Sequence, residues 1–252
     1  MLIAPFNDLE TTSAIIDRYS DELAGVIVEP FQRLLPPKQG FLEGLREITS
    51  HYEIPLIFDE VVTGFRFSYG GAQDYYGVVP DICTLGKAIA GGFPLTAVAG
   101  RDEIMTHFDS DKVEKEGFMP HIGTLNGNPV ACAAGLATLD ILKQDGVYDG
   151  IFDTGRKVMK GLQDILDNSE IPGKVVGESV LFDVFFTTEE VYDYRSALKA
   201  DSQKLSRFNQ LLLEHGVLKG TTKFYFSTEH DDKDVERTLA AFGEVIEIMR
   251  SE

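Results

Sequence analysis

Residues 81–94 of the chain read Asp-Ile-Cys-Thr-Leu-Gly-Lys-Ala-Ile-Ala-Gly-Gly-Phe-Pro. The run Ile82–Leu85 is short and apolar and is followed at once by glycine, which predicts a buried strand that ends in a tight turn. Lys87 follows this glycine, Gly86. A lysine between a buried strand and a glycine-rich turn is expected to be withdrawn from water, which suits a nucleophilic amine. The ordinary alternative is a strand-end lysine that reaches back to solvent.

Similar apolar runs lie on both sides of this segment. Gly25–Val28, Pro55–Phe58 and Thr96–Ala99 are each short enough for a strand, and 41–52 has the spacing of an amphipathic helix. Continuous apolar strands alternating with helices predict an α/β domain with a mostly parallel sheet flanked by helices. In such sheets, functional residues gather beyond the carboxyl ends of the strands.

Asp59 lies at such a strand end, in the string Phe-Asp-Glu-Val-Val-Thr-Gly-Phe-Arg that begins at Phe58. Together with Lys87, it indicates a site for pyridoxal phosphate, whose ring accepts electrons only when a carboxylate keeps its nitrogen protonated. Val61, two residues further along, is expected to face the same way and to pack on the ring. The alternative for Asp59 is a carboxylate that caps the next turn.

The third segment of interest is Gly123–Pro129, which leads into an alanine-rich helix. The hydroxyl of Thr124 and the free N–H groups of a helix N-terminus would suit a phosphate group. The alternative is ordinary capping of that helix by Asn128, with Thr124 a turn residue.

The pattern changes in the second half of the chain. Helical stretches are expected at about 148–166, 202–215 and 232–249, and strands at 180–186 and 223–226. We therefore expect residues 1–145 to belong to a large domain and residues 146–252 to form a small α+β domain.

Charge and cysteine content narrow the class of protein. The chain has 41 acidic and 23 basic residues and a net charge of -18, which disfavours nucleic acid and anionic membranes as partners. This charge fits either a solvated acidic surface or a salt-rich cytosol. Cys83 and Cys132 have no neighbouring ligands at metal-binding spacing, so no metal site is expected. No leader or membrane span is predicted, and a cytoplasmic location is expected.

The three segments, in this order, resemble class III pyridoxal-phosphate-dependent aminotransferases, and most closely the glutamate-1-semialdehyde aminomutase-like branch. The resemblance implies the fold-type I architecture of these transferases and pyridoxal 5'-phosphate as cofactor. It also implies that Lys87 forms the internal aldimine, a Schiff base with the cofactor, that Asp59 pairs with the ring nitrogen and that Val61 presses on the ring. By the same resemblance, Thr124 holds the phosphate bound by a partner subunit, so a homodimer with shared active sites is expected.

Departures from the family pattern define the alternatives. Family members are much longer, so the sequence resembles their C-terminal portion, with the N-terminal part of the large domain missing. Gly220–Phe226 lacks the glutamate that true aminomutases have in the corresponding string. We therefore favour a transaminase of unknown amino donor, which exchanges amino groups between an amino acid or amine and a 2-oxo acid or aldehyde. The alternatives are an aminomutase and a truncated, non-catalytic module that acts in dimerisation.

Overall fold

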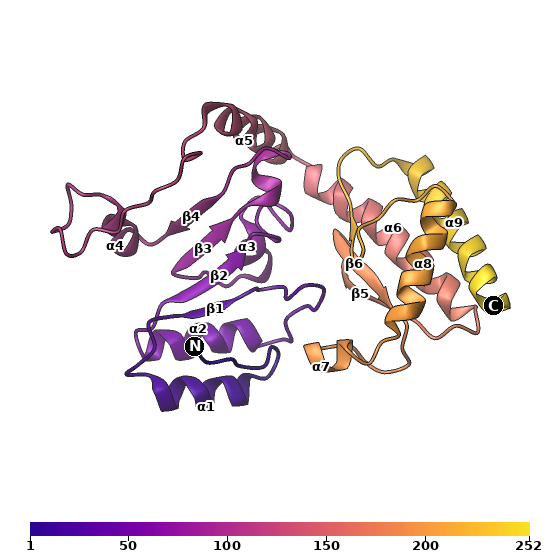
Figure 1. Ribbon diagram of the computed structural model, residues 1–252, viewed down its shortest axis with the longest axis horizontal. Helices are drawn as coiled ribbons and strands as arrows, with labels where there is room; N and C mark the ends of the chain where they lie inside the picture. Colours follow the sequence, from indigo (N-terminus) through magenta and orange to yellow (C-terminus); the bar gives the residue numbers. More distant parts are fainter. The chain divides into compact units, whose positions relative to one another are not determined.

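The computed structural model describes residues 1–252, which form two compact units (Figure 1). The N-terminal unit comprises residues 1–30 and 39–144, and the C-terminal unit comprises residues 31–38 and 145–252. None of the helices combines the length and the apolar character needed to span a bilayer.

The N-terminal unit is built on a mixed, mostly parallel sheet, as the sequence predicts. Its strands are β1 (Val26–Val28), β2 (Leu56–Glu60), β3 (Ile82–Leu85) and β4 (Ala97–Gly100), in the order β1-β2-β3-β4 (Figure 1). The first three strands are parallel, and β4 is antiparallel to β3. A parallel return would need a longer crossover. Here the chain turns back through the 3-10 helix η1 (Lys87–Ala90) and two glycines with positive φ, Gly91 and Gly92.

The helices of this unit are partly those expected from the sequence. They are α1 (Leu9–Tyr19), α2 (Phe41–His51), α3 (Gly71–Tyr76), α4 (Asp102–Met105), the 3-10 helix η2 (Thr106–Phe108) and α5 (Pro129–Leu142). Helices α2 and α5 correspond to predicted helices, whereas α1, α3 and α4 were not foreseen. Helix α1 contains two adjacent threonines, which weaken its local helical signal, but Asp8 caps it and Ile16 is buried.

The two faces of this sheet differ in burial. Leu56, Phe58 and Glu60 alternate along β2 and are all 0% exposed. The opposite face carries Asp59 and Ile57, which are half-buried. In register with Ile57 on this face lies Ile27, which is 65% exposed. The helices of this unit therefore do not fully cover the sheet face that carries Asp59.

Asp81, just before β3, holds three parts of the N-terminal unit together. Its carboxylate accepts hydrogen bonds from the backbone N–H of Leu56 (2.7 Å), from Arg46 of α2 (2.8 Å) and from Arg101 after β4 (2.9 Å). Burial by itself raises the pKa of Asp81, but these three donors outweigh it and hold the pKa below its ordinary value.

This arrangement predicts a dependence of stability on pH. Because the pKa of Asp81 is lower in the folded than in the unfolded chain, its ionised form stabilises the fold above the ordinary aspartate pKa. That contribution is lost as the pH falls through the folded-state pKa. In urea unfolding, Asp81→Asn should be less stable than wild type at neutral pH, and the gap should narrow between about pH 4 and pH 2. A gap that stays constant over this range would contradict the role of the ionised carboxylate.

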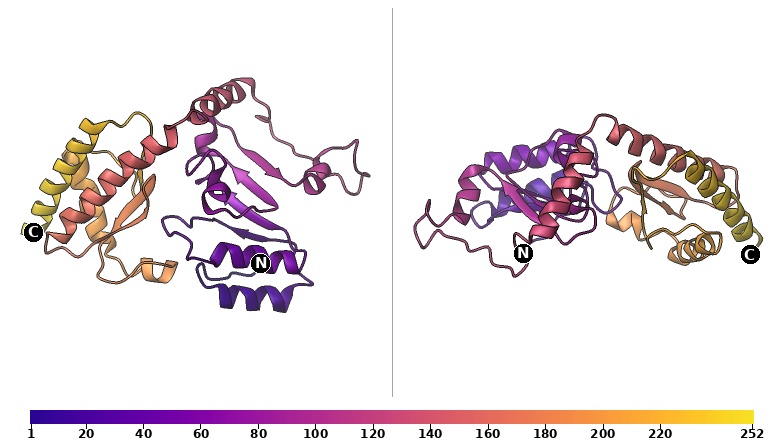
Figure 2. Two further views of the ribbon diagram at one scale, coloured as in Figure 1. Left: turned by 180° about the vertical axis from the view of Figure 1, so that it is seen from behind. Right: turned by 90° about the horizontal axis from the view of Figure 1, so that it is seen from above.

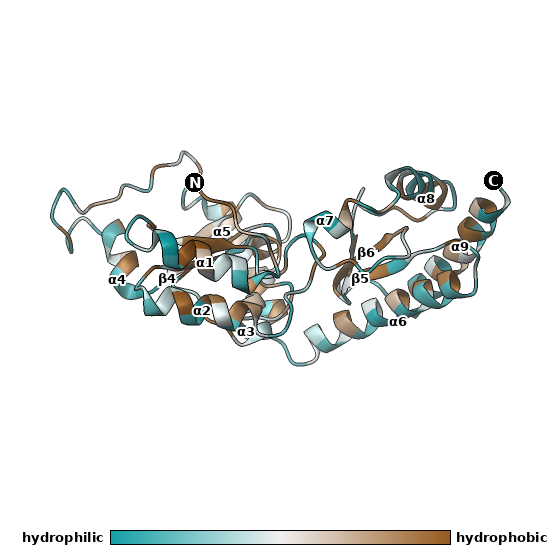
Figure 3. Ribbon diagram, turned by 90° about the horizontal axis from the view of Figure 1, so that it is seen from below, coloured by the Kyte–Doolittle hydropathy of each residue, from teal (hydrophilic) through white to brown (hydrophobic).

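The C-terminal unit is an α+β fold with a small antiparallel sheet. Its helices are α6 (Val147–Asp167), α7 (Tyr194–Ala197), α8 (Ser202–Glu214) and α9 (Asp232–Ser251), and its strands are β5 (Lys174–Glu178), β6 (Leu181–Phe185) and β7 (Phe224–Tyr225). The strand order is β5-β6-β7. Figure 3 shows hydrophobic and hydrophilic residues alternating along α6 and α9, as expected for helices with one buried face. The sequence predicted every one of these elements except α7 and β5.

Aromatic rings form the centre of this unit. Phe182 of β6 stacks on Phe226 at 5.5 Å between ring centroids and lies 5.3 Å from Phe224. Phe242 of α9 packs edge-on against Phe224 at 5.4 Å and also contacts Phe208 of α8. These contacts bind both helices to the sheet and bury large apolar areas.

A buried ion pair lies beside this aromatic cluster. Lys219 Nζ donates to Asp183 Oδ2 at 2.9 Å, and the two side chains are 3% and 1% exposed. The ammonium group also donates to the carbonyl of Gly220 and lies 4.7 Å from the ring centroid of Phe224. Burial raises the pKa of Asp183 and lowers the pKa of Lys219, and in each case the partner's charge opposes the effect.

Candidate active site

The carboxyl ends of β2 and β3 bring together the residues that the sequence singled out around Asp59 and Lys87. The two strands are parallel neighbours in which Asp59 pairs with Thr84 and Glu60 with Leu85. Asp59 and Lys87 therefore emerge at the same edge of the sheet. This placement follows from strand direction and register and agrees with the sequence expectation for these two residues.

The carboxylate of Asp59 is held by two donors at a single oxygen. Its Oδ1 accepts from the backbone N–H of Val61 at 3.1 Å and from the hydroxyl of Thr84 at 3.2 Å. The bond to Val61 is the turn-capping contact considered as an alternative from the sequence. It leaves Oδ2 without a hydrogen-bond partner in the structure, so a capping role and a ligand-binding role are compatible.

Val61 lies against the backbone that leads to Lys87. A methyl group placed on Gly86 would be 3.4 Å from Val61 Cγ1 and 3.6 Å from Thr96 Cγ2, so little room separates these residues. The side chain of Val61 is half-buried. It therefore stands between the carboxylate of Asp59 and the start of η1, where it can contact a flat group held by both.

Lys87 has an unusual backbone and an exposed side chain. Its φ is 49°, in the left-handed region that costs residues other than glycine roughly 1–2 kcal/mol. Strain of this kind is often concentrated at functional sites. The expectation that Lys87 is withdrawn from water is wrong for these 252 residues, because Lys87 is exposed. In the preceding strand, β3, only Cys83 is fully buried, and the other residues are half-buried.

Glu60 is a buried carboxylate that the sequence reasoning missed. It is 0% exposed and accepts hydrogen bonds from the backbone N–H groups of Ala72 (2.5 Å) and Gln73 (3.2 Å) at the start of α3. The hydroxyl of Thr63 and the side-chain amide of Gln73 also donate to it. Gly71 has a φ of 78°, and a Cβ there would lie 2.4 Å from Glu60 Oε2. Glu60 thus fixes the loop that follows Asp59 and Val61.

Thr124 is placed differently from the other candidate residues. It lies in an exposed turn before α5, whereas Asp59, Val61 and Lys87 lie at or just beyond the ends of β2 and β3. Asn128 Oδ1 accepts from the N–H groups of Val130 (3.0 Å) and Ala131 (3.1 Å), so these groups are not free for a phosphate. The capping alternative is therefore correct for Asn128.

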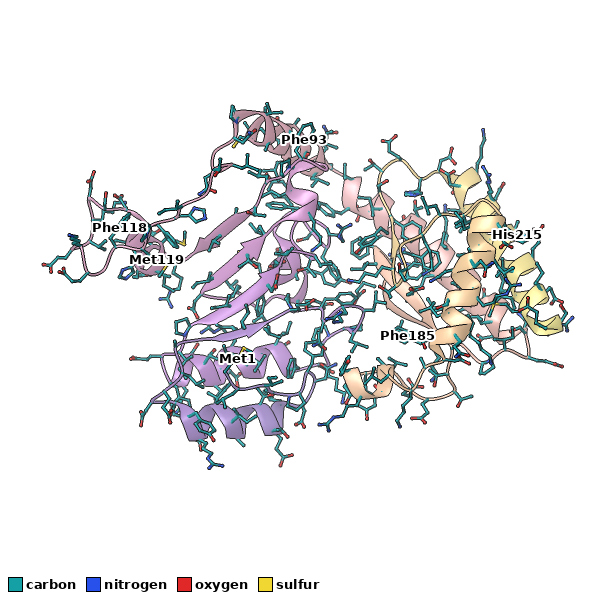
Figure 4. All side chains as sticks on the ribbon, viewed as in Figure 1. Met1, Phe93, Phe118, Met119, Phe185 and His215 are labelled. Atoms are coloured by element: carbon teal, nitrogen blue, oxygen red, sulfur yellow. The ribbon has the colours of Figure 1, made fainter.

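The segment that carries Thr124 projects from the N-terminal unit. Figures 1 and 2 show the chain between η2 and α5 as an extended loop that leaves the sheet. Figure 4 places Phe118 and Met119 on this loop, away from the strands, and Phe93 beside α5.

The side chains of Asp59, Val61 and Lys87 fit part of a pyridoxal phosphate group. An unpartnered carboxylate oxygen at Asp59, an apolar side chain at Val61 and an exposed amine at Lys87 match a ring nitrogen, a ring face and an aldehyde, respectively. No group of three His, Cys, Asp or Glu side chains is placed to hold a metal ion.

Comparisons with known proteins give the family. The family model for class III aminotransferases matches residues 4–229. The chain is 39% identical over 244 residues, 94% of its length, to glutamate-1-semialdehyde 2,1-aminomutase from Natranaerobius thermophilus. Its structure is similar to that of an omega-transaminase from Sphaerobacter thermophilus, with a TM-score of 0.92 and 34% identity over 98% of the chain. It is also similar to a transaminase with pyridoxal phosphate bound, with a TM-score of 0.89, 29% identity and 99% of the chain covered.

The chain belongs to the class III aminotransferase family of pyridoxal-phosphate-dependent enzymes. It spans a little over half the length of these relatives: 56% of the aminomutase, 57% of the omega-transaminase and 58% of the third protein. The family resemblance drawn from the three sequence segments is therefore confirmed, as is the α/β fold of these transferases.

Proposed function

We propose that the protein transfers amino groups with pyridoxal phosphate held at Lys87. The observation that carries this proposal is that Asp59 at the end of β2 and Lys87 just beyond β3 lie at the same edge of the sheet, with an Asp59 oxygen free to accept a hydrogen bond. The substrates we propose are an amino acid or amine together with a 2-oxo acid or aldehyde, and the location we propose is the cytoplasm. Residues 1–145 would supply these groups as part of the cofactor-binding domain, and residues 146–252 would form the small domain.

Each residue of the site has a separate task in this proposal. When bound, pyridoxal phosphate supplies an aldehyde that captures amines and a ring that draws electrons from the substrate. Lys87 Nζ would hold the cofactor through its aldehyde and would carry a proton to and from the reacting carbon. Asp59 would accept a hydrogen bond from the ring N–H and so favour the protonated ring nitrogen. Val61 packs against the ring and limits its orientation.

Dimerisation is part of the proposal and is supported by helix α5. This helix is apolar around most of its circumference, yet Val130, Leu136 and Ile141 are each more than half exposed. A helix of this kind is normally buried. Ile122 and Leu125, on the preceding loop with Thr124, are exposed as well. A second copy of the chain would cover these side chains and bring Thr124 to the phosphate of the neighbouring site.

Covalent trapping tests the role of Lys87. The purified protein is mixed with pyridoxal phosphate, reduced with borohydride and mapped by peptide mass spectrometry, and we expect an adduct confined to Lys87. The matched control is Lys87→Gly, which removes the amine and the left-handed strain and should unfold within about 1 kcal/mol of wild type. It should lose the adduct while remaining folded. No adduct, or adducts spread over many surface lysines, would instead favour the non-catalytic module that acts in dimerisation.

An aminomutase is the second candidate, favoured by the 39% identity to glutamate-1-semialdehyde 2,1-aminomutase. The two activities differ in whether a keto product leaves the enzyme. Amino transfer to 2-oxoglutarate or pyruvate supports the transaminase. Sustained turnover of a semialdehyde without any acceptor would replace it with the aminomutase.

A further inference from the structure

The orientation of the Asp59 carboxylate depends on one side chain from the neighbouring strand. Two donors converge on Oδ1: the backbone N–H of Val61 and the hydroxyl of Thr84. Any residue at position 61 other than proline would supply the backbone donor. The hydroxyl, in contrast, is specific to the residue at position 84.

The sheet places this hydroxyl where it can act. Thr84 lies directly opposite Asp59 in the parallel pairing of β2 and β3, so both side chains are on the same face. Its other neighbour in register is Val98 of β4, which offers no hydrogen-bonding group. The carboxylate of Asp59 is therefore the polar side chain that the Thr84 hydroxyl meets across the sheet.

Two donors at one oxygen restrict the carboxylate more than one donor would. With Val61 N–H alone, the group can turn about its terminal torsion, which is broad for aspartate, and expose either oxygen. The Thr84 hydroxyl, approaching from the adjacent strand, removes much of this freedom. Oδ1 is thereby occupied by the protein, and Oδ2 is left free on the half-buried face.

We propose that Thr84 is a positioning residue that orients Asp59 for the ring nitrogen of pyridoxal phosphate. The inference rests on the proposed function, and it adds a residue to that site. Thr84 does not touch the cofactor in this role. It acts through Asp59, so its removal should matter only where a ring nitrogen is present to be bound.

The test compares Thr84→Val, which keeps the shape and strand preference, with Thr84→Ser, which keeps the hydroxyl. Dissociation constants are measured for pyridoxal phosphate and for its 1-deaza analogue, in which carbon replaces the ring nitrogen. We expect Thr84→Val to bind pyridoxal phosphate about tenfold more weakly, and Thr84→Ser to stay within about threefold of wild type. Binding of the deaza analogue should be the same in all three proteins. Equal losses for both ligands in Thr84→Val, or no loss at all, would overturn the proposal.

Crystal structures of the cofactor-free variants give a second, independent measurement. In Thr84→Val the Asp59 carboxylate should rotate or occupy several orientations, and in Thr84→Ser it should stay as in wild type. An unmoved carboxylate in Thr84→Val would also overturn the proposal. If wild type binds no cofactor, the proposed function fails, and these structures still decide whether Thr84 positions Asp59.

Discussion

Lys219→Met should lower the free energy of unfolding of the C-terminal unit by about 3–5 kcal/mol, because it leaves the charge of Asp183 buried without its countercharge. Asp183 is 1% exposed, and water cannot take the place of the ammonium group. Methionine has nearly the volume of the lysine stem, so the loss is electrostatic rather than a packing defect. Since the chain has no tryptophan, unfolding in urea is best followed by circular dichroism.

Two further variants separate the charge from the packing. Lys157→Met removes a lysine that is 54% exposed and pairs with Asp232 on the surface, and it should leave the unfolding transition essentially unchanged. The double variant Asp183→Leu/Lys219→Met removes both charges and should recover most of the lost stability. If the double variant is as unstable as Lys219→Met, the buried charge is not the cause.

Glu60→Ala should destabilise the N-terminal unit by about 3–4 kcal/mol, since the buried N–H of Ala72 and the part-buried N–H of Gln73 lose their acceptor at roughly 1–3 kcal/mol each. The Thr63 hydroxyl and the Gln73 amide lose their partner as well. Circular dichroism in urea measures the change.

The matched control is Glu47→Ala, in which an exposed glutamate of α2 is removed and little change is expected. Glu60→Gln is also expected to destabilise, because an amide presents an N–H to donors that need an acceptor. A Glu60→Ala protein that unfolds at the same urea concentration as wild type would show that these contacts add nothing to stability.

The sequence was sufficient where the signal is local. The apolar runs Pro55–Phe58 and Ile82–Leu85 predict β2 and β3, because short apolar segments bounded by turn residues favour strands. Parallel direction then places Asp59 and Lys87 at one edge. Capping by Asn128 could also be read from neighbouring residues, because an N-cap bonds within its own first turn.

The tertiary structure decided the long-range hydrogen bonds and the burial of side chains, because both depend on which segments are neighbours in space. The bond from Thr84 to Asp59 spans 25 positions and that from Lys219 to Asp183 spans 36, and no local pattern encodes either pairing. Burial of Glu60 follows from α3, a six-residue helix too short for a periodic signal. The exposure of Lys87 likewise depends on which segments, distant in sequence, pack over it. The sequence alone therefore determined which residues lie at the sheet edge of the candidate site and which family their motifs indicate. Only the fold, by setting register and burial, decided how Asp59 is held and that Lys87 is left open to solvent.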